Sequence, residues 1–150
     1  MRIMAVDYGD ARTGVAVSDE SATLAGDAWV IHSKRINDIV SAIVYEAGNR
    51  NVSCIVVGFP KNMDGSIGSR AEKSLQLADF LRVSIQQLKS STSPLSIEVV
   101  MWDERLTTMS AHRVLSDVGT FGKKRKKTVD AVAASLILEG YLAFLKNSEK

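Results

Sequence analysis

The strongest constraint on the fold is the apolar run Cys54-Ile55-Val56-Val57, which stands between two segments of helical periodicity. Apolar residues recur at helical spacing over residues 36–47 before the run and over residues 71–88 after it. A short apolar run between two helices is typical of a buried strand in an α/β protein. The pattern therefore predicts alternating α/β units, whose right-handed crossovers add parallel strands to one sheet.

The first part of the chain has a different pattern. Short β-type runs at residues 3–6 and 13–18 are joined by a turn-like segment, and residues 28–31 form a third candidate strand. Because no helical repeat separates these three runs, they predict an antiparallel meander.

The remaining segments complete the order of elements. Residues 97–102 predict another strand, a short helix is expected near Thr108, and residues 129–144 carry the apolar stripe of a terminal helix. Ser69 and Glu72 fit a capping box at the start of the second long helix. The prediction is an α/β fold with a mixed central sheet, antiparallel in its first three strands and parallel thereafter, flanked by helices.

Composition indicates a folded protein of one domain over residues 1–150. The chain is 45% hydrophobic and 24% charged, which excludes a disordered or fibrous class. Its single cysteine, Cys54, cannot form an internal disulfide, so a reducing compartment is the simpler interpretation. An acidic residue at position 7 interrupts any signal-like apolar run, and no apolar stretch is long enough to cross a bilayer. We expect a cytoplasmic protein with no membrane partner.

Charge is concentrated at one place. The net charge is only +2, yet Lys123, Lys124, Arg125, Lys126 and Lys127 are consecutive. Such a run is often a solvated loop, and it can also attract the phosphates of a nucleic acid.

Acidic residues stand at the ends of elements that should meet at one edge of the sheet. Asp7 follows the first strand, Asp103 and Glu104 follow the last strand, and Asp130 falls in the first predicted turn of the last helix. Hard cations such as Mg²⁺ require converging carboxylates, and two such ions ~3.5–4 Å apart can hydrolyse a phosphodiester. Because neighbouring strand residues point to opposite faces, only one of Asp103 and Glu104 is expected to face the metals.

Each acidic residue also has an ordinary structural interpretation. Asp7 could be a turn residue, and Asp130 could complement the positive end of its helix dipole. Asp103 and Glu104 could form a surface ion-pair cluster with Arg105. The metal-site hypothesis therefore depends on all of them occurring together.

Four sequence blocks resemble one known family. MRIMAVDYGDARTGVAVSD, VVGFPKNMDGSIGSRAEK, VVMWDERLTT and KKTVDAVAASLIL are similar, in this order, to segments of the YqgF family and cover almost the whole chain. The resemblance implies a ribonuclease H-like fold related to the Holliday junction resolvases, consistent with the predicted order of elements. It also implies that Asp7, Glu104 and Asp130 are the catalytic carboxylates. Members of the family are described as nucleases that mature the 5′ end of the small-subunit ribosomal RNA precursor.

The resemblance also indicates where nucleic acid would be contacted. The loop from Phe59 to Arg70 could hold a phosphate with its backbone amides and Arg70, or it could be a plain connection whose glycines serve turn geometry, and the resemblance favours the phosphate contact. The basic run would lie beside the metal site and attract nucleic acid without regard to sequence. The expected nucleic-acid contacts are Arg12, Asn62, Gly65, Arg70, Arg105, Lys123, Lys124, Arg125, Lys126 and Lys127.

The leading functional prediction is a nuclease that uses Mg²⁺ or Mn²⁺ to cleave pre-16S ribosomal RNA. A Holliday junction resolvase acting on branched DNA is the first alternative, and it requires a symmetric dimer to cut two strands. A nucleic-acid-binding module without catalysis is the second. The sequence leaves open whether the chain is a monomer or a homodimer.

Overall fold

The computed structural model describes residues 1–89, 96–104 and 122–148, and for residues 122–130 it describes the backbone alone. The elements follow the predicted order. They are β1 (Arg2–Asp7), β2 (Arg12–Ser18), β3 (Ala25–His32), α1 (Ile36–Asn49), β4 (Val52–Phe59), α2 (Ser69–Leu88), β5 (Glu98–Asp103) and α4 (Gly122–Ser148).

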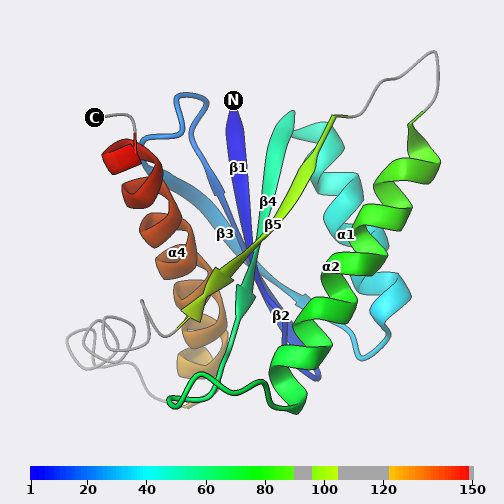
Figure 1. Cartoon of the computed structure of the whole chain (residues 1–150), viewed down its shortest axis with the longest axis vertical. Helices are drawn as coiled ribbons and strands as arrows, with labels where there is room; N and C mark the ends of the chain where they lie inside the picture. Colours follow the sequence, from blue (N-terminus) through cyan, green and yellow to red (C-terminus); the bar gives the residue numbers. More distant parts are fainter. Residues whose placement is uncertain (90–95, 105–121, 149–150) are drawn as a thin grey trace.

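The strands form one mixed sheet in the order β3-β2-β1-β4-β5. β1 pairs antiparallel with β2, and β2 pairs antiparallel with β3, as the meander predicts. β4 lies between β1 and β5 and pairs parallel with both. The carboxyl ends of β1, β4 and β5 consequently point to the same edge, at the bottom of Figure 1.

Helices cover both faces of the sheet (Figure 1). α1 and α2 pack on the face that carries Met4 and Val6 of β1, whereas α4 packs on the face that carries Ile3 and Ala5. β4 is central, so both sets of its alternating side chains are buried. Burial on both faces explains why residues 54–57 are apolar without a break.

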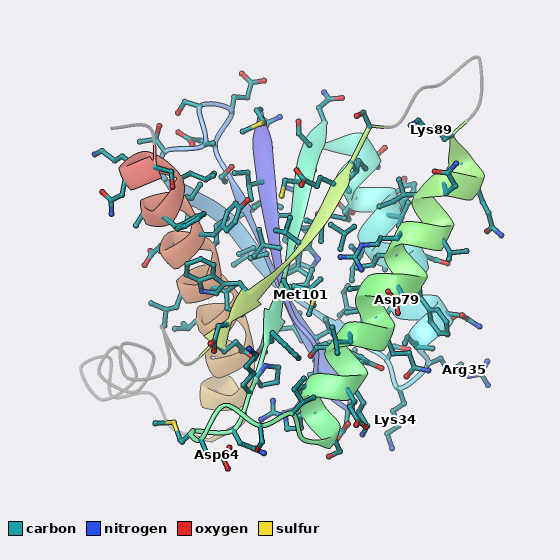
Figure 2. The ribbon with its side chains drawn as sticks, in the orientation of Figure 1. Lys34, Arg35, Asp64, Asp79, Lys89 and Met101 are labelled. Atoms are coloured by element: carbon teal, nitrogen blue, oxygen red, sulfur yellow. The ribbon has the colours of Figure 1, made fainter. Side chains whose placement is uncertain are left out.

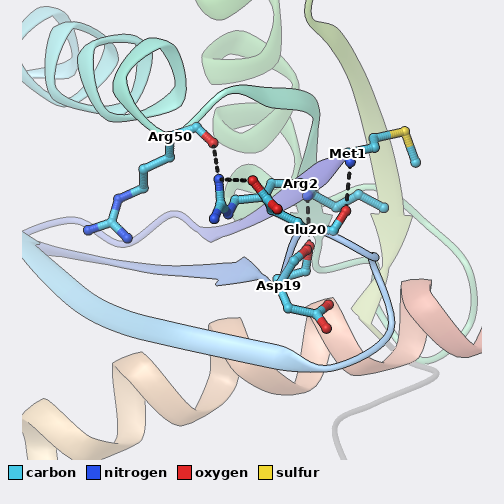
Figure 3. A network of polar contacts seen from close by, with 7 residues as sticks. Met1, Arg2, Asp19, Glu20 and Arg50 are labelled. Carbon is cyan, nitrogen blue, oxygen red and sulfur yellow. Dashed lines mark hydrogen bonds and ion pairs between the residues drawn. The ribbon is translucent and has the colours of Figure 1, made fainter.

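Polar contacts tie the amino-terminal end of β1 to its surroundings (Figure 3). The Met1 ammonium group donates to the Glu20 carbonyl oxygen at 2.6 Å, and Arg2 donates to the Arg50 carbonyl oxygen at 3.0 Å. The Ile3 amide donates to Ser18 Oγ at 2.9 Å. These contacts lie at the end of the strand opposite to Asp7.

Two local predictions are wrong. α2 has Gly68 as its N-cap, with no side-chain cap hydrogen bond, so Ser69 and Glu72 form no capping box. α4 begins at Gly122, so residues 123–127 belong to the helix and Asp130 does not fall in its first turn. Lys and Arg are good helix formers, and a helix can therefore extend beyond its apolar stripe. The helix expected near Thr108 lies outside the described residues.

Within the described ranges, no helix combines the length and the apolarity that a membrane crossing requires.

The central strand should dominate the stability of the fold. Ile55 is fully buried in the core beneath α1 and α2. Ile55→Ala should lower the free energy of unfolding by about 2–5 kcal/mol, because it removes apolar contacts and leaves a cavity. Urea unfolding measures the change. Val83→Ala, at an exposed position of α2, is the matched control and should stay within about 0.5 kcal/mol of the parent.

Candidate active site

Three parallel strands and the starts of two helices converge at one edge of the molecule (Figure 1). Asp7 is the last residue of β1, Phe59 ends β4 and Asp103 ends β5. Because the strands are parallel, the loops that leave them emerge together, as at the ligand sites of other α/β sheets. The acidic residues at positions 7, 103 and 104 therefore share this edge.

The alternation of β5 separates its two terminal acidic residues. Met101 packs toward α1 and α2, whereas Trp102 packs toward α4. By the same alternation Asp103 falls on the α2 side, and Glu104 falls on the α4 side together with Asp7. The structure thus brings Glu104, rather than Asp103, to the face that Asp7 shares.

Gly58 provides the surface over which the Glu104 side chain lies. Gly58 is the β4 residue paired with Trp102, and the preceding residue Val57 pairs with Val6 of β1. A Cβ atom built on Gly58 would lie 2.9 Å from Glu104 Cδ and 2.7 Å from Ile137 Cδ1 of α4. The Glu104 side chain accordingly extends from β5 over β4 toward β1, on the face of the sheet where Ile137 of α4 packs.

Burial and Asp7 together raise the pKa of Glu104 to about 8, from an ordinary value of 4.5. Burial is the largest cause, followed by the negative charge of Asp7 and by a hydrogen bond with Asp7 that favours protonated Glu104. Asp103 raises the pKa further, and the positive charge of Arg70 opposes the shift. The Glu104 carboxyl group is thus held beside Asp7 in a partly buried place where its ionisation is disfavoured.

Arg70 and Lys73 supply positive charge at this edge from the first turns of α2, Arg70 acting on Glu104 and Lys73 pairing with Asp10. Lys73 Nζ donates to Asp10 Oδ1 at 3.0 Å, which links α2 to the turn between β1 and β2. This hydrogen bond, the charge of Lys73 and the charge of Arg70 lower the pKa of Asp10. Arg70 itself is exposed, so its guanidinium group faces solvent near the two carboxylates.

The β4–α2 loop, residues 60–68, is closed by its own hydrogen bonds. The Gly65 amide donates to the Asn62 carbonyl oxygen at 2.8 Å, and Asn62 Nδ2 donates to Ser66 Oγ at 3.0 Å. Gly65 has a φ of 88°, a conformation that favours glycine. Figure 2 shows Asp64 at the tip of this loop, where its Oδ1 accepts from Ser66 Oγ at 2.6 Å. The loop therefore presents a preformed surface beside the strand ends.

The turn before β2 holds Arg12 close to the same edge. Arg12 is half-buried and begins β2, where it pairs with His32 of β3. A Cβ atom on Gly9 would collide with the Arg12 carbonyl oxygen, so the turn requires glycine at that position. Nucleic-acid contact by Arg12, Asn62, Gly65 and Arg70 stays a prediction.

Some expected site residues cannot be compared with the structure. Arg105 lies outside the described residues. Asp130 and the basic run 123–127 are placed in α4 by their backbone, and their side chains lie outside the described part.

The donor set fits a divalent cation in its chemistry. Asp7 and Glu104 are neighbouring carboxyl groups, and a bound cation would favour the ionised form of Glu104. Carboxylate oxygens are the ligands that Mg²⁺ prefers. Among the described residues, no group of three or more His, Cys, Asp or Glu side chains is placed to hold a metal ion. A third carboxylate would have to come from outside that set.

Cys54 takes no part in this site. Its thiol is buried on the α4 side, and burial raises its pKa to about 11. A thiol of this kind is a poor nucleophile near neutral pH, in agreement with the structural role predicted from its apolar neighbours.

Sequence reasoning missed Gly58. A glycine that directly follows a buried apolar run was a usable signal, since glycine inside a strand often marks a close approach of other atoms. Which atoms approach it depends on the pairing of β4 with β5.

The fold resembles that of known Holliday junction resolvases. RuvC of Thermus thermophilus, solved with a Holliday junction substrate, aligns with a TM-score of 0.62 and 12% sequence identity over 97% of this chain and 96% of that one. The resolvase of Fowlpox virus, solved with its junction DNA, aligns with a TM-score of 0.58 and 13% identity over 97% and 99% of the two chains. At these identities the likeness defines the class of fold, which is ribonuclease H-like as the order of elements indicated.

Sequence comparison then identifies the family. The model of the RuvX family, described as a Holliday junction resolvase, matches residues 1–144. A relative from Halothermothrix orenii is 45% identical over 144 residues, which are 96% of each chain. A relative from Caldanaerobacter subterraneus subsp. tengcongensis is 42% identical over 149 residues, 99% of this chain and 100% of its own. Both relatives carry the name "Putative pre-16S rRNA nuclease". The chain belongs to the RuvX family, also known as YqgF.

Removing the charge of Glu104 should stabilise the metal-free protein at alkaline pH. In the unfolded chain Glu104 ionises at its ordinary pKa of 4.5, whereas in the folded protein it holds its proton up to about pH 8. Stability is therefore fully present below pH 4.5 and is lost as the pH rises toward 8. Glu104→Gln avoids this loss and should be more stable than the parent by about 1–3 kcal/mol above that range.

Urea unfolding in EDTA at several pH values measures this difference. Glu98→Gln, at an exposed position at the other end of β5, is the matched control. Equal pH-dependent gains in both variants would show that the burial of Glu104 beside Asp7 is not the cause.

Proposed function

We propose that this chain is a metal-dependent nuclease that hydrolyses phosphodiester bonds of RNA in the 5′-end maturation of pre-16S ribosomal RNA. The observation that carries the proposal is the meeting of the Asp7 and Glu104 carboxyl groups at the carboxyl ends of the parallel strands. The names of the relatives and the family match support the nuclease activity and its substrate. The proposal treats residues 1–150 as one nuclease domain that acts in the cytoplasm.

The metal ligands in this proposal are Asp7, Glu104 and Asp130, with Mg²⁺ or Mn²⁺ as the cation. Asp130 precedes the buried Ala134 of α4 by four residues, which is about one helical turn. Residues four positions apart lie on the same face of a helix, so position 130 is on the face of α4 that packs on the sheet. This placement supports Asp130 as the third ligand. Bound divalent ions would generate a nucleophile from water at neutral pH and stabilise the leaving oxygen.

Residues of the chain itself would orient the substrate. Gly68, the N-cap residue of α2, makes no side-chain cap hydrogen bond, and the first amides of the helix could donate to a phosphate oxygen. Arg70 stands at the same helix end and is exposed. Ile137 and the β4 backbone cover Glu104 from one side and exclude water there. Substrate would therefore approach from the open edge, where the β4–α2 loop lies.

The start of α4 would attract nucleic acid. Residues 123–127 are all cationic and lie in the first turns of this helix, where the helix dipole also leaves positive partial charge. These two contributions have the same sign. They would favour phosphates close to Asp130, which follows in the same helix.

The second candidate is a Holliday junction resolvase. It is favoured by the description of the family and by the fold shared with two resolvases that were solved with junction DNA. This activity requires two active sites in a symmetric dimer, whereas cleavage of single-stranded RNA requires one.

The decisive assay uses a labelled precursor of 16S ribosomal RNA and a four-way DNA junction in parallel, with Mg²⁺, Mn²⁺ or EDTA. We expect cleavage of the RNA, abolished by EDTA and lowered at least ~10²-fold by Asp7→Asn, because this substitution removes a metal ligand. Asp79→Asn, an exposed position of α2 paired with Arg82, is the matched control and should cleave normally.

Other results of this assay would change the assignment. Cleavage of the junction alone, by a dimer, would favour the resolvase. Binding of nucleic acid without cleavage by any metal would favour a binding module.

Neutralising the basic run should weaken RNA binding in a salt-dependent way. With residues 123–127 replaced by Ser, the slope of log affinity against log salt should fall by roughly 0.7 for each phosphate that the run no longer neutralises. Filter binding over a range of salt concentrations measures the slope. Replacement of Lys89 and Lys146, at the C-terminal ends of α2 and α4, controls for net charge and should leave the slope nearly unchanged. An unaltered slope without the basic run would exclude its contact with phosphates.

A further inference from the structure

We propose that Gly58 is a positioning residue for Glu104, because its lack of a side chain lets Glu104 cross the central strand and meet Asp7. This inference rests on the proposed function, in which Glu104 and Asp7 bind the same metal. It adds the requirement that β4, which contributes no carboxylate to the proposed site, has a residue without a side chain at position 58.

Strand order makes such a crossing necessary. Asp7 ends β1 and Glu104 follows β5, and β4 lies between these two strands. Neighbouring strands are about 4.8 Å apart, so the backbones of β1 and β5 are separated by roughly 9.6 Å. A glutamate is one methylene longer than an aspartate and can extend its carboxyl group over the intervening backbone.

The space above Gly58 is already filled by other side chains. A Cβ atom there would lie 2.9 Å from Glu104 Cδ, 3.1 Å from Glu104 Cγ and 2.7 Å from Ile137 Cδ1. Real Cβ atoms do not tolerate the shorter two of these separations. Ile137 is 1% exposed within the α4 core, whereas Glu104 is only partly buried. Glu104 has more freedom to move, so an added methyl group would displace its carboxyl group.

Backbone conformation does not explain the glycine. Gly65 has a positive φ, but Gly58 does not, and Gly58 pairs regularly with Trp102 in the β4–β5 ladder. Extended backbone of this kind accepts any residue, and most residues suit a strand better than glycine does. The need for room is therefore the physical reason for glycine at this position.

Close approach of a ligand is the other common reason for glycine in a strand. Here Glu104 and Ile137 of the protein itself occupy the space. Gly58 thus acts on the proposed metal through Glu104.

The test is Mn²⁺ binding to the Gly58→Ala variant, measured by electron paramagnetic resonance without any nucleic acid. Affinity should fall about 10–100-fold, the usual effect of disturbing a group that orients a metal ligand. RNA cleavage should fall with it, while RNA affinity in EDTA stays unchanged. Gly48→Ala is the matched control, since a Cβ atom on Gly48 meets nothing within 4 Å. Unchanged Mn²⁺ affinity in a folded Gly58→Ala protein would overturn the proposal.

A second pair of variants separates crowding of Glu104 from disturbance of the core. Ile137→Val removes the Cδ1 atom that the new methyl group would meet, so Gly58→Ala/Ile137→Val retains only the conflict with Glu104. The double variant should bind Mn²⁺ more weakly than Ile137→Val alone, and equal affinities would overturn the proposal even if Gly58→Ala does not fold.

Failure of the proposed function can be distinguished from failure of this inference. If the wild-type chain binds Mn²⁺ but cleaves no RNA, the nuclease proposal fails and the Mn²⁺ affinities still decide the role of Gly58. If the wild-type chain binds no Mn²⁺, a crystal structure of the double variant decides whether Gly58 positions Glu104. Glu104 displaced from Asp7 supports the inference, and Glu104 in its original place overturns it.

Discussion

Parallel pairing of β4 with both β1 and β5 is the interaction on which the candidate site depends. It aligns three strand ends at one edge, so that residues separated by almost one hundred positions in sequence become neighbours. If β5 ran in the opposite direction, Glu104 would lie at the edge where Met1 and Arg2 make their polar contacts (Figure 3). The helices between the strands are what permit this parallel arrangement, because a parallel connection must return along the sheet.

The same sheet also keeps the carboxyl groups of Asp7 and Glu104 close together. Asp7 ends β1 and Glu104 follows β5, and Ile137 of α4 lies beside the Glu104 side chain above Gly58. Hydrophobic contacts throughout the sheet fix both backbones, so the two carboxyl groups stay close enough to share a hydrogen bond while Glu104 is protonated and to repel each other once it ionises. Without a cation, the site lowers the stability of the fold as the pH rises toward 8 and Glu104 ionises. Such local strain in an otherwise well-packed protein is common at functional sites.

Much of this arrangement could be predicted from the sequence. The apolar run at 54–57 and the helical repeats on both sides indicate parallel strands, and parallel strands imply a shared edge for Asp7 and Glu104. The family resemblance favoured Glu104, but the residue pattern by itself left Asp103 and Glu104 both open, because the choice depends on which face of β5 packs against α4. The importance of Gly58 depends on the register between β4 and β5, which no single segment encodes.

The boundaries of the helices were less predictable for a related reason. Apolar periodicity reports only the part of a helix that contacts the sheet, so the start of α4 at Gly122 leaves no such signal. The capping box failed at Ser69 because Gly68 occupies the N-cap position. The N-cap of α2 is set by the loop that precedes the helix, so the apolar periodicity of the sequence does not reveal it.

The length of α4 has a consequence for how the basic run and Asp130 would share a substrate. An α-helix rises about 1.5 Å per residue, so position 130 lies roughly 4.5–10.5 Å along the axis from residues 123–127. The repeat of a nucleic-acid strand is about 3.4 Å per nucleotide along a duplex. If Asp130 binds the proposed metal, this helix would hold its cations about one to three nucleotides from the bond to be cut.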